Sequence, residues 1–534
     1  MARTGADPGR EPRPRQRRGR HRDREVAERH DRHVHGQHQR PLPDRPEARE
    51  VQALDRVHRH EGRLGRRRLQ AGGQPRSGRR QQRNEDHARQ AVAGTRAQRS
   101  PTSVRAYASA MAVRTRHSGR RGRIRGFGYF SRLGPAFITG AADDDPSGIG
   151  TYSQVGAAFG FGLLWMSVVT LPLAAGVQEL AARFGLATGH GLASCIARRY
   201  SRGVLIGAVA LVATANLFNI GADLGAMASS VRLLVRVPYT AVIVAMTAVM
   251  LALEIAVPYR TYSRVLRWLT LSLGAYVGVL FVIDVDWAGV LRATFVPSAT
   301  MNRAELGAII AVLGTTISPY LFFWQASEEV EEEEQLGTKP GVLLDRRHVR
   351  AMRGDVAAGM TSAVFVMFAI MVASASTLHA ARITNVHTAA EAASALEPVA
   401  GRFASLLFTL GIVGTGMLAV PVLAGSTAYA LADAFGWEEG LGKTFRQARG
   451  FYSVIAGAMV VGLAMDFAGI DPIRGLYLPA ILNGLAAPPL ILLMLFLGND
   501  PGTMGSWRSG WVSNALVGLA LLAMVLAPIA YLLS

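Results

Sequence analysis

Residues 133–162 read LGPAFITGAADDDPSGIGTYSQVGAAFGFG, an apolar stretch that three consecutive acids interrupt. The stretch is long enough to cross a bilayer, because a hydrocarbon core of about 30 Å needs about 20 residues of helix. Asp143, Asp144 and Asp145 lie in its middle, followed directly by Pro146. One charged side chain at the centre of a membrane helix costs about 2.5–3.5 kcal/mol on insertion scales, so three acids are tolerated only if they face water, a cation or one another.

Pro146 and Gly148 predict a break in the helix at this point, which leaves backbone carbonyls free to face a ligand. Carboxylates and carbonyls are hard oxygen donors, and such donors suit Mg²⁺, Mn²⁺ and Ca²⁺. The stretch therefore predicts a site for a divalent cation inside a membrane.

A second apolar stretch, LGAIIAVLGTTISPYLFFWQAS at residues 306–327, carries its own break at Ser318 and Pro319. A proline kink that only adjusts packing would explain either break alone. The two breaks fall, however, in the first and the sixth predicted spans, and interrupted helices at matching positions of two five-helix halves are typical of inverted-repeat transporters. The binding site of such transporters lies at the midplane between the halves, so we expect the two breaks to meet.

Residues 126–534 predict a transmembrane domain of eleven helices. Lipid cannot hydrogen-bond the backbone, so Gly-, Ala- and Leu-rich runs of this length indicate helices rather than strands. A large soluble core is the alternative, but the repeated occurrence of runs of span length disfavours it. The predicted spans lie near residues 131–158, 161–184, 203–232, 237–257, 262–283, 304–327, 355–379, 402–433, 450–468, 474–497 and 511–533.

The distribution of Arg and Lys predicts the orientation of these helices. If the N-terminus is cytoplasmic, the cytoplasmic loops hold fifteen basic residues and the external loops hold seven. Basic residues favour the cytoplasmic side. We therefore expect a multi-pass protein of the inner (plasma) membrane with a cytoplasmic N-terminus and an external C-terminus.

Residues 1–125 differ from the rest in composition, since they hold 34 of the 58 Lys and Arg but only 13 of the 38 acids. Up to residue 106 there is no Phe, Trp, Tyr, Ile or Lys, so this Arg-rich tail is expected to be disordered. Three interpretations stay open: a misassigned start, with Met111 as the candidate start, contact with an anionic membrane surface, and nucleic-acid binding. Nucleic acid is not expected as a partner, because no aromatic residues for base stacking are interleaved. Deletion of residues 1–110 would separate a nucleic-acid-binding protein from a transporter, because transport should survive it and any nucleic-acid retention should vanish.

Residues 178–193, QELAARFGLATGHGLA, and the GPAF of the first span carry a family resemblance. Together with the acid-proline break they resemble the NRAMP family (natural resistance-associated macrophage proteins) over about residues 131–500. The resemblance implies an all-α integral membrane protein of LeuT-type fold, with inverted five-helix repeats at about 131–283 and 304–497 and an extra helix at about 511–533. It also implies transport of divalent metal ions, linked to protons in the family, rather than an enzyme with a bound cofactor.

The resemblance carries a metal-binding motif in the first helix, Asp-Pro-Gly-Asn, whose first half is similar to Asp145-Pro146. The motif's Asn falls at Gly148, so that side-chain ligand is missing. By the resemblance, Asp145 is the central ligand, with Asp144 beside it and the Ala142 backbone carbonyl as a further oxygen.

In the sixth helix the family has Met-Pro-His, where this sequence has Ser318-Pro319-Tyr320. A thioether favours transition metals, whereas a hydroxyl adds a hard oxygen. The site is therefore expected to be harder and more acidic, with Thr315 and Ser318 as its helix-six ligands. It is similar to a branch of the family that lacks the Met and is associated with Mg²⁺ and Mn²⁺.

The family's proton route consists of an acid-rich third helix and the helix-six His, and most of these residues are replaced in this sequence. Asn216 and Asn219 take the approximate places of the acids, and only Asp223 titrates. Asp223 is expected to serve ion coupling or hydration of the site, or else to hydrogen-bond Asn219. Asn483 of the tenth span is a site residue or an interhelical hydrogen-bonding residue. The remaining residues expected near the site are Asp143 and Tyr320.

These features predict import of Mn²⁺ or Mg²⁺ into the cytoplasm by alternating access. The choice between the two ions and the participation of protons stay open. The main alternative is a LeuT-fold symporter of an amino acid or another organic solute, but three aspartates would repel a substrate carboxylate. The second alternative is a membrane-anchored protein that binds nucleic acid through its tail.

Overall fold

The computed structural model describes residues 135–257, 274–298, 300–335, 345–467 and 472–534. Every regular element within these ranges is helical, as the sequence predicts. The predictions for the tail and Met111, and for most of the fifth span, lie outside the described residues.

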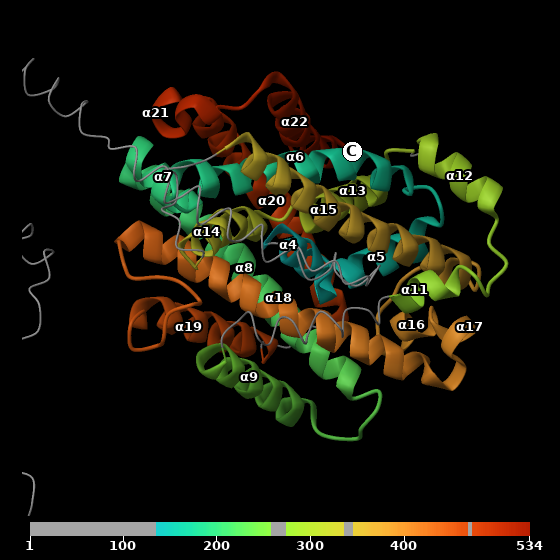
Figure 1. Cartoon of the computed structure of the whole chain (residues 1–534). Coiled ribbons are helices and arrows are strands. Elements are labelled where there is room, and N and C mark those ends of the chain that lie inside the picture. Colours follow the sequence, from blue (N-terminus) through green and yellow to red (C-terminus); the bar gives the residue numbers. More distant parts are fainter. Residues whose placement is uncertain (1–134, 258–273, 299, 336–344, 468–471) are drawn as a thin grey trace, which may run out of the picture. The chain divides into compact units, whose positions relative to one another are not determined.

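The described helices carry the labels of Figure 1. They are α4 (Pro135–Asp143), α5 (Pro146–Phe159), α6 (Trp165–Thr188), α7 (Leu192–Arg199), α8 (Arg202–Val231), α9 (Tyr239–Ala256), α11 (Gly274–Val279), α12 (Trp287–Phe295), α13 (Arg303–Thr316), α14 (Pro319–Gln335), α15 (Arg346–Ser374), the π-helical turn η3 (Ala375–His379), α16 (Ala389–Ser394), α17 (Glu397–Ala400), the 3₁₀ turn η4 (Gly401–Phe403), α18 (Ala404–Phe435), α19 (Arg449–Asp466), α20 (Pro472–Asn499), α21 (Pro501–Met504), the 3₁₀ turn η5 (Gly505–Trp507) and α22 (Trp511–Leu533).

Nine helical segments in the described ranges are long and apolar enough to cross a membrane. They correspond to nine of the eleven predicted spans. The first predicted span is divided into α4 and α5, each too short to cross alone, and the fifth is described only from α11 onward. A count of eleven spans therefore stays a prediction.

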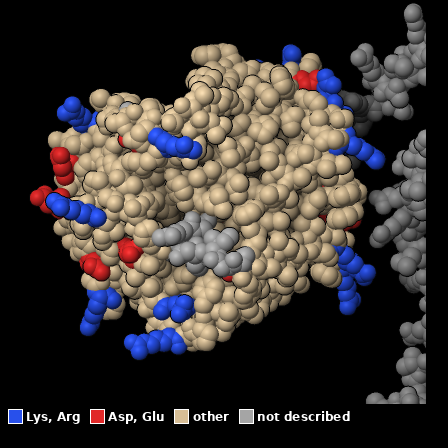
Figure 2. All heavy atoms as spheres, turned by 180° about the vertical axis from the view of Figure 1, so that it is seen from behind, with Lys and Arg blue, Asp and Glu red and all other residues tan. Residues whose placement is uncertain are grey.

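The broken helices occupy the interior of the bundle. Of the most apolar 18 residues in the segment formed by α13 and α14, 94% are buried, against 22% in α9 and in α22. Figure 1 shows α4 and α5 surrounded by the other helices. The surface is largely apolar, with large exposed side chains such as Ile206, Phe496 and Leu519, and charged side chains are sparse on the face that Figure 2 shows. This surface suits contact with lipid.

Glycines allow the broken helices to pack closely against their neighbours. A methyl group on Gly140 of α4 would lie 2.5 Å from the carbonyl group of Gly359 in α15. A methyl group on Gly314 of α13 would overlap the Ala480 carbonyl oxygen of α20. Small residues at helix crossings are typical of membrane proteins, and here they bring the helix that precedes each break close to a neighbouring helix.

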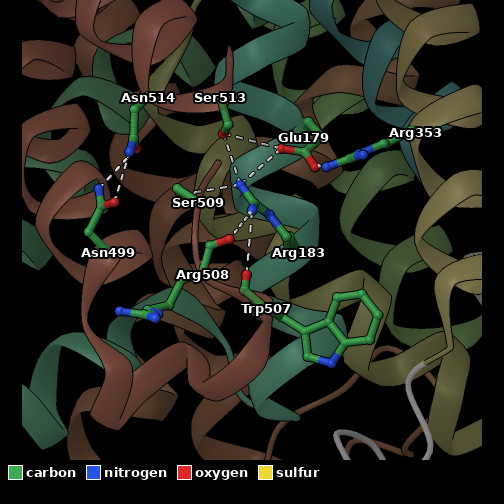
Figure 3. A network of polar contacts seen from close by, with 9 residues as sticks. All are labelled: Glu179, Arg183, Arg353, Asn499, Trp507, Arg508, Ser509, Ser513 and Asn514. Atoms are coloured by element: carbon green, nitrogen blue, oxygen red, sulfur yellow. Dashed lines mark hydrogen bonds and ion pairs between the residues drawn. The ribbon is translucent and has the colours of Figure 1, made fainter. Parts of the chain in front are cut away.

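A buried arginine attaches the last helix to the bundle (Figure 3). Arg183 of α6 donates hydrogen bonds to Glu179 at 3.0 Å and to Ser513 of α22 at 2.9 Å. It also donates to the backbone carbonyls of Trp507 and Arg508 in the segment that precedes α22, at 3.4 and 3.3 Å. This network fixes the position of α22 outside the two predicted repeats.

Candidate metal site

The break between α4 and α5 confirms the first predicted interruption. Asp144 and Asp145 are not helical, and Pro146 begins α5. Asp145 has an extended backbone, with φ −69° and ψ 170°, as expected for a residue that precedes proline. Its Oδ1 atom accepts hydrogen bonds from the Gly148 N–H at 2.6 Å and from the Ser147 hydroxyl at 2.7 Å. Asp145 is therefore the N-cap of α5, and one of its carboxylate oxygens is already used within the protein.

The break between α13 and α14 has the same plan. Ile317 and Ser318 are not helical, and Pro319 begins α14. The Ser318 hydroxyl donates to the carbonyls of Gly314 at 2.9 Å and of Thr315 at 2.7 Å. Ser318 thus satisfies carbonyls that the end of α13 would otherwise leave without a partner.

Tyr320 of α14 joins the two breaks. Its hydroxyl donates to the Ala142 carbonyl at 3.1 Å and lies 3.5 Å from Oδ2 of Asp145. Both acceptors are predicted ligands, so the structure brings Ala142, Asp145 and Tyr320 together. The tyrosine is fully buried, and its hydroxyl lies beside the carboxylate oxygen that the N-cap of α5 leaves free.

Gly148 lies between an oxygen atom of each break. A Cβ atom at this position would be 3.2 Å from the Asp143 carbonyl oxygen and 3.3 Å from Oγ1 of Thr315. The space into which a side chain at position 148 would extend is therefore bordered by oxygens from α4 and α13. Tyr152, one turn further along α5, makes a second contact between α5 and α13, because its hydroxyl lies 3.2 Å from Oγ1 of Thr316.

The third helix of the predicted domain, α8, contacts the first break through Asp223. Its Oδ1 atom accepts a hydrogen bond from the Ser147 N–H at 3.1 Å. The predicted alternative, a hydrogen bond between Asp223 and Asn219, is wrong, because the buried Asn219 side chain has no partner in the described part of the chain. Asn216 instead packs α8 against α18, donating to Ser426 and Thr427 at 3.0 and 2.9 Å.

Several buried polar atoms near the breaks have no hydrogen-bond partner among the described residues. They include one carboxylate oxygen each of Asp143, Asp144 and Asp223, and the side-chain oxygen of Asn483. These four side chains are at most 5% exposed. Asn483 belongs to the part of α20 whose backbone contacts Gly314. Buried polar groups are normally paired, and an unmatched one calls for a ligand such as an ion or water.

The arrangement does not form a site from acidic side chains alone. Across the described ranges, no three His, Cys, Asp or Glu side chains are positioned to hold one metal ion. The oxygens that the structure brings together are of mixed origin: a carboxylate from Asp145, a carbonyl from Ala142 and a hydroxyl from Tyr320. The Thr315 hydroxyl lies beside Gly148 of the first break. Mixed oxygen sets of this kind suit hard divalent cations.

The sequence analysis missed a polar chain between α4 and α14. The Thr139 hydroxyl donates to the Gln325 side-chain oxygen at 2.6 Å, and the Gln325 amide donates to Glu329 at 2.9 Å. All three side chains are buried. Gln325 was visible as the one amide within the apolar run at 306–327, but the partner on α4 depends on the tertiary structure.

Solved structures with a similar arrangement belong to transporters. The Eremococcus coleocola manganese transporter, in complex with an aromatic bis-isothiourea substituted compound, matches with a TM-score of 0.59 at 18% identity, over 76% of this chain and 87% of that chain. Mhp1, a nucleobase-cation-symport-1 family transporter, matches in a closed conformation with a TM-score of 0.50 at 16% identity, over 75% and 91%. The fold therefore defines a multi-pass helical membrane protein of LeuT type, built around two interrupted helices.

Sequence comparison identifies the family. Residues 136–534 match the model of the natural resistance-associated macrophage protein-like family, and the chain belongs to this family. It is 28% identical over 405 residues to the divalent metal cation transporter MntH of Klebsiella pneumoniae (strain 342), covering 72% of this chain and 91% of that protein. The protein of the same name from Yersinia pestis (strain Pestoides F) is 31% identical over 300 residues, covering 54% and 69%.

Proposed function

We propose that this chain is a divalent metal cation transporter whose ion binds at the break between α4 and α5. The observation that carries the proposal is the set of buried carboxylate oxygens without partners on Asp143 and Asp144 in the described part of the chain, directly before Asp145, whose Oδ2 atom lies 3.5 Å from the Tyr320 hydroxyl. Such charges are costly in a membrane protein unless an ion accompanies them. The family and the names of its relatives support the same conclusion.

The proposed cargo is a hard cation, Mn²⁺ or Mg²⁺. Carboxylate, carbonyl and hydroxyl oxygens suit both ions. Ser318 stands where the resemblance places a Met, so the soft ligand that would disfavour Mg²⁺ is missing. Gly148 lacks the side-chain ligand of the family motif, and the Asp143 carbonyl and the Thr315 hydroxyl lie close to its Cα atom.

Alternating access would proceed by movement of the half-helices on either side of the breaks. On one side α4 contacts α14 through the bond between Thr139 and Gln325, and on the other α5 contacts α13 through Tyr152 and Thr316. Opening the first pair would expose the ion to the cytoplasm, and opening the second pair would expose it to the outside. The predicted orientation makes this movement an import.

Tyr320 would respond to the ion directly. Its hydroxyl hydrogen lies on the Ala142 carbonyl oxygen, and a cation bound to that oxygen would repel the hydrogen. Rotation of the hydroxyl would then offer its own oxygen to the ion. Asp223 would transmit the change to α8, because it accepts a hydrogen bond from the Ser147 N–H, next to Asp145.

Ion flux into proteoliposomes tests the proposal. We expect the purified full chain to carry Mn²⁺ and Mg²⁺ in preference to Ca²⁺, which prefers larger coordination shells. A pH dye inside the vesicles reports whether protons accompany the ion, and we expect no acidification because Tyr320 stands in place of the family's His. Absence of flux for all three ions would contradict the proposal. Deletion of residues 1–110 should leave the flux unchanged, since the proposed site lies wholly within residues 126–534.

A further inference from the structure

A cavity of about 870 Å³ lies next to the site, on the side that the arginine distribution predicts to be external. Helices α5, α13, α20 and α22 and the segment around residue 386 line it. Its polar lining is provided by Gln154, Arg303, Thr384, Asn385, His387, Tyr477 and Tyr531.

The cavity is formed by the same helices that carry the site. Gly150 lines it and follows Asp145 by five residues, a rise of about 7.5 Å along a helix. Gly307 lines it and precedes Thr315 by eight residues, or about 12 Å. The side chain of Leu476 packs directly on Gly150. A cation that enters through this cavity approaches the site along α5 and α13.

Arg303 is the residue of permanent charge in the cavity lining as the structure describes it. Its guanidinium group lies 4.9 Å from the centre of the Tyr531 ring, which holds the charge at the cavity wall. No Asp or Glu belongs to this described lining. The nearby carboxylates lie outside this lining and keep their charge: Glu305 accepts from the Met301 N–H at 2.8 Å, and Glu391 accepts from the His387 N–H at 2.6 Å.

We propose that Arg303 makes the entrance positive and thereby sets the rate at which divalent cations reach the site. The proposal rests on the proposed transport function and on entry through this cavity. A unit positive charge about 8 Å from a divalent cation in water lowers the local cation concentration roughly fivefold before screening. Arg303 also begins α13, whose N-terminus adds potential of the same sign, partly offset by Glu305 in the first turn. The entrance of a cation transporter thus carries a charge that slows capture of its own cargo.

Uptake of Mn²⁺ at subsaturating concentration tests the kinetic effect. Between about 10 mM and about 300 mM salt the Debye length falls from about 30 Å to about 6 Å. Wild-type uptake should rise with salt, because screening weakens the repulsion. Arg303→Lys should behave like the wild type. Arg303→Gln should be about two- to threefold faster at low salt and should lose the rise with salt, and Arg303→Glu should reverse the slope. Arg292→Gln is the matched control, because Arg292 is exposed on α12 and does not line the cavity.

A measurement that needs no transport separates this inference from the proposed function. Cys195 is the one cysteine of the sequence. It is buried, and burial raises the pKa of its thiol to about 11, so Cys195→Ser provides a background without a competing thiol. In that background, Asn385→Cys should react faster with an anionic methanethiosulfonate than with a cationic one of similar size, relative to Ala288→Cys on exposed α12.

Arg303→Glu should reverse this preference. An unchanged preference in Arg303→Gln and Arg303→Glu, both shown to be folded by size-exclusion profile, would overturn the inference whether or not Mn²⁺ flux is found. Loss of all Mn²⁺ flux with the reagent preference intact would contradict the proposed function and leave the positive entrance supported.

Discussion

The two helix breaks have the same backbone arrangement, but their side chains cap helices on opposite sides of the break. In each, two non-helical residues precede a proline that begins the next helix: Asp144 and Asp145 before α5, and Ile317 and Ser318 before α14. Asp145 caps the helix that follows, by accepting the Gly148 N–H. Ser318 caps the helix that precedes, by donating to two carbonyls of α13.

The difference determines which break can receive a cation. At the first break Asp145 accepts the Gly148 N–H and Asp223 accepts the Ser147 N–H. The Ala142 carbonyl at the end of α4 accepts a hydrogen bond from Tyr320 of the other break. At the second break Ser318 occupies the terminal carbonyls of α13. All three acids belong to the first break. The first break therefore provides the charge. The second break provides neutral oxygens and, through Tyr320, the contact that joins the two breaks.

The largest effect is expected from Asp145→Ala. Loss of a buried carboxylate ligand costs about 3 kcal/mol, so Mn²⁺ uptake should fall by about 100-fold or more, to the level of empty vesicles. Asp286→Ala is the matched control, because Asp286 caps α12 by accepting the Gly289 N–H at 3.0 Å. Each variant loses a cap worth about 1 kcal/mol, but only Asp145→Ala should lose uptake. Uptake like that of the wild type would show that the ion does not bind at the first break.

A smaller effect is expected from Asp144→Asn. Asp144 has a buried carboxylate oxygen without a hydrogen-bond partner, and its charge contributes to the attraction of a divalent ion without the capping role of Asp145. Removing the charge at nearly constant volume should weaken Mn²⁺ binding about tenfold, or about 1.4 kcal/mol. Titration calorimetry measures the change. An unaltered dissociation constant would show that Asp144 does not face the ion.

Ser318→Met should increase the difference between the breaks by giving the second break a soft, thioether ligand. A thioether favours Mn²⁺ over Mg²⁺, so the ratio of Mn²⁺ to Mg²⁺ uptake should rise about fivefold, or about 1 kcal/mol. Competition of the two ions for uptake measures the ratio. A constant ratio with a folded protein would mean that position 318 does not reach the ion.

The smallest effect is expected from Ser318→Ala. The carbonyls of Gly314 and Thr315 lose a donor, which costs about 1 kcal/mol of stability. Uptake should stay within about threefold of the wild type, because the hydroxyl acts mainly within α13. Thermal unfolding in detergent and flux measure the two quantities. A loss of flux as large as that of Asp145→Ala would erase the distinction between the breaks.

The positions of both breaks could be predicted from the sequence, because a proline inside an apolar run has few structural interpretations. The three aspartates predicted the charged break for the same reason. The direction of each cap could not be predicted, since Asp145 and Ser318 each had donors or acceptors on both sides. The contacts of Tyr320 with Ala142 and of Asp223 with Ser147 join residues more than 70 positions apart, and they depend on how the helices pack.

Ion binding by the purified full chain tests the central claim most directly. Titration calorimetry with Mn²⁺ and with Mg²⁺ requires neither an orientation in the membrane nor a transport cycle. We predict saturable heat with a dissociation constant at or below the millimolar range, and its loss in Asp145→Ala but not in Asp286→Ala. No detectable binding of either ion, with Asp143, Asp144 and Asp145 intact and the protein folded, would contradict the account.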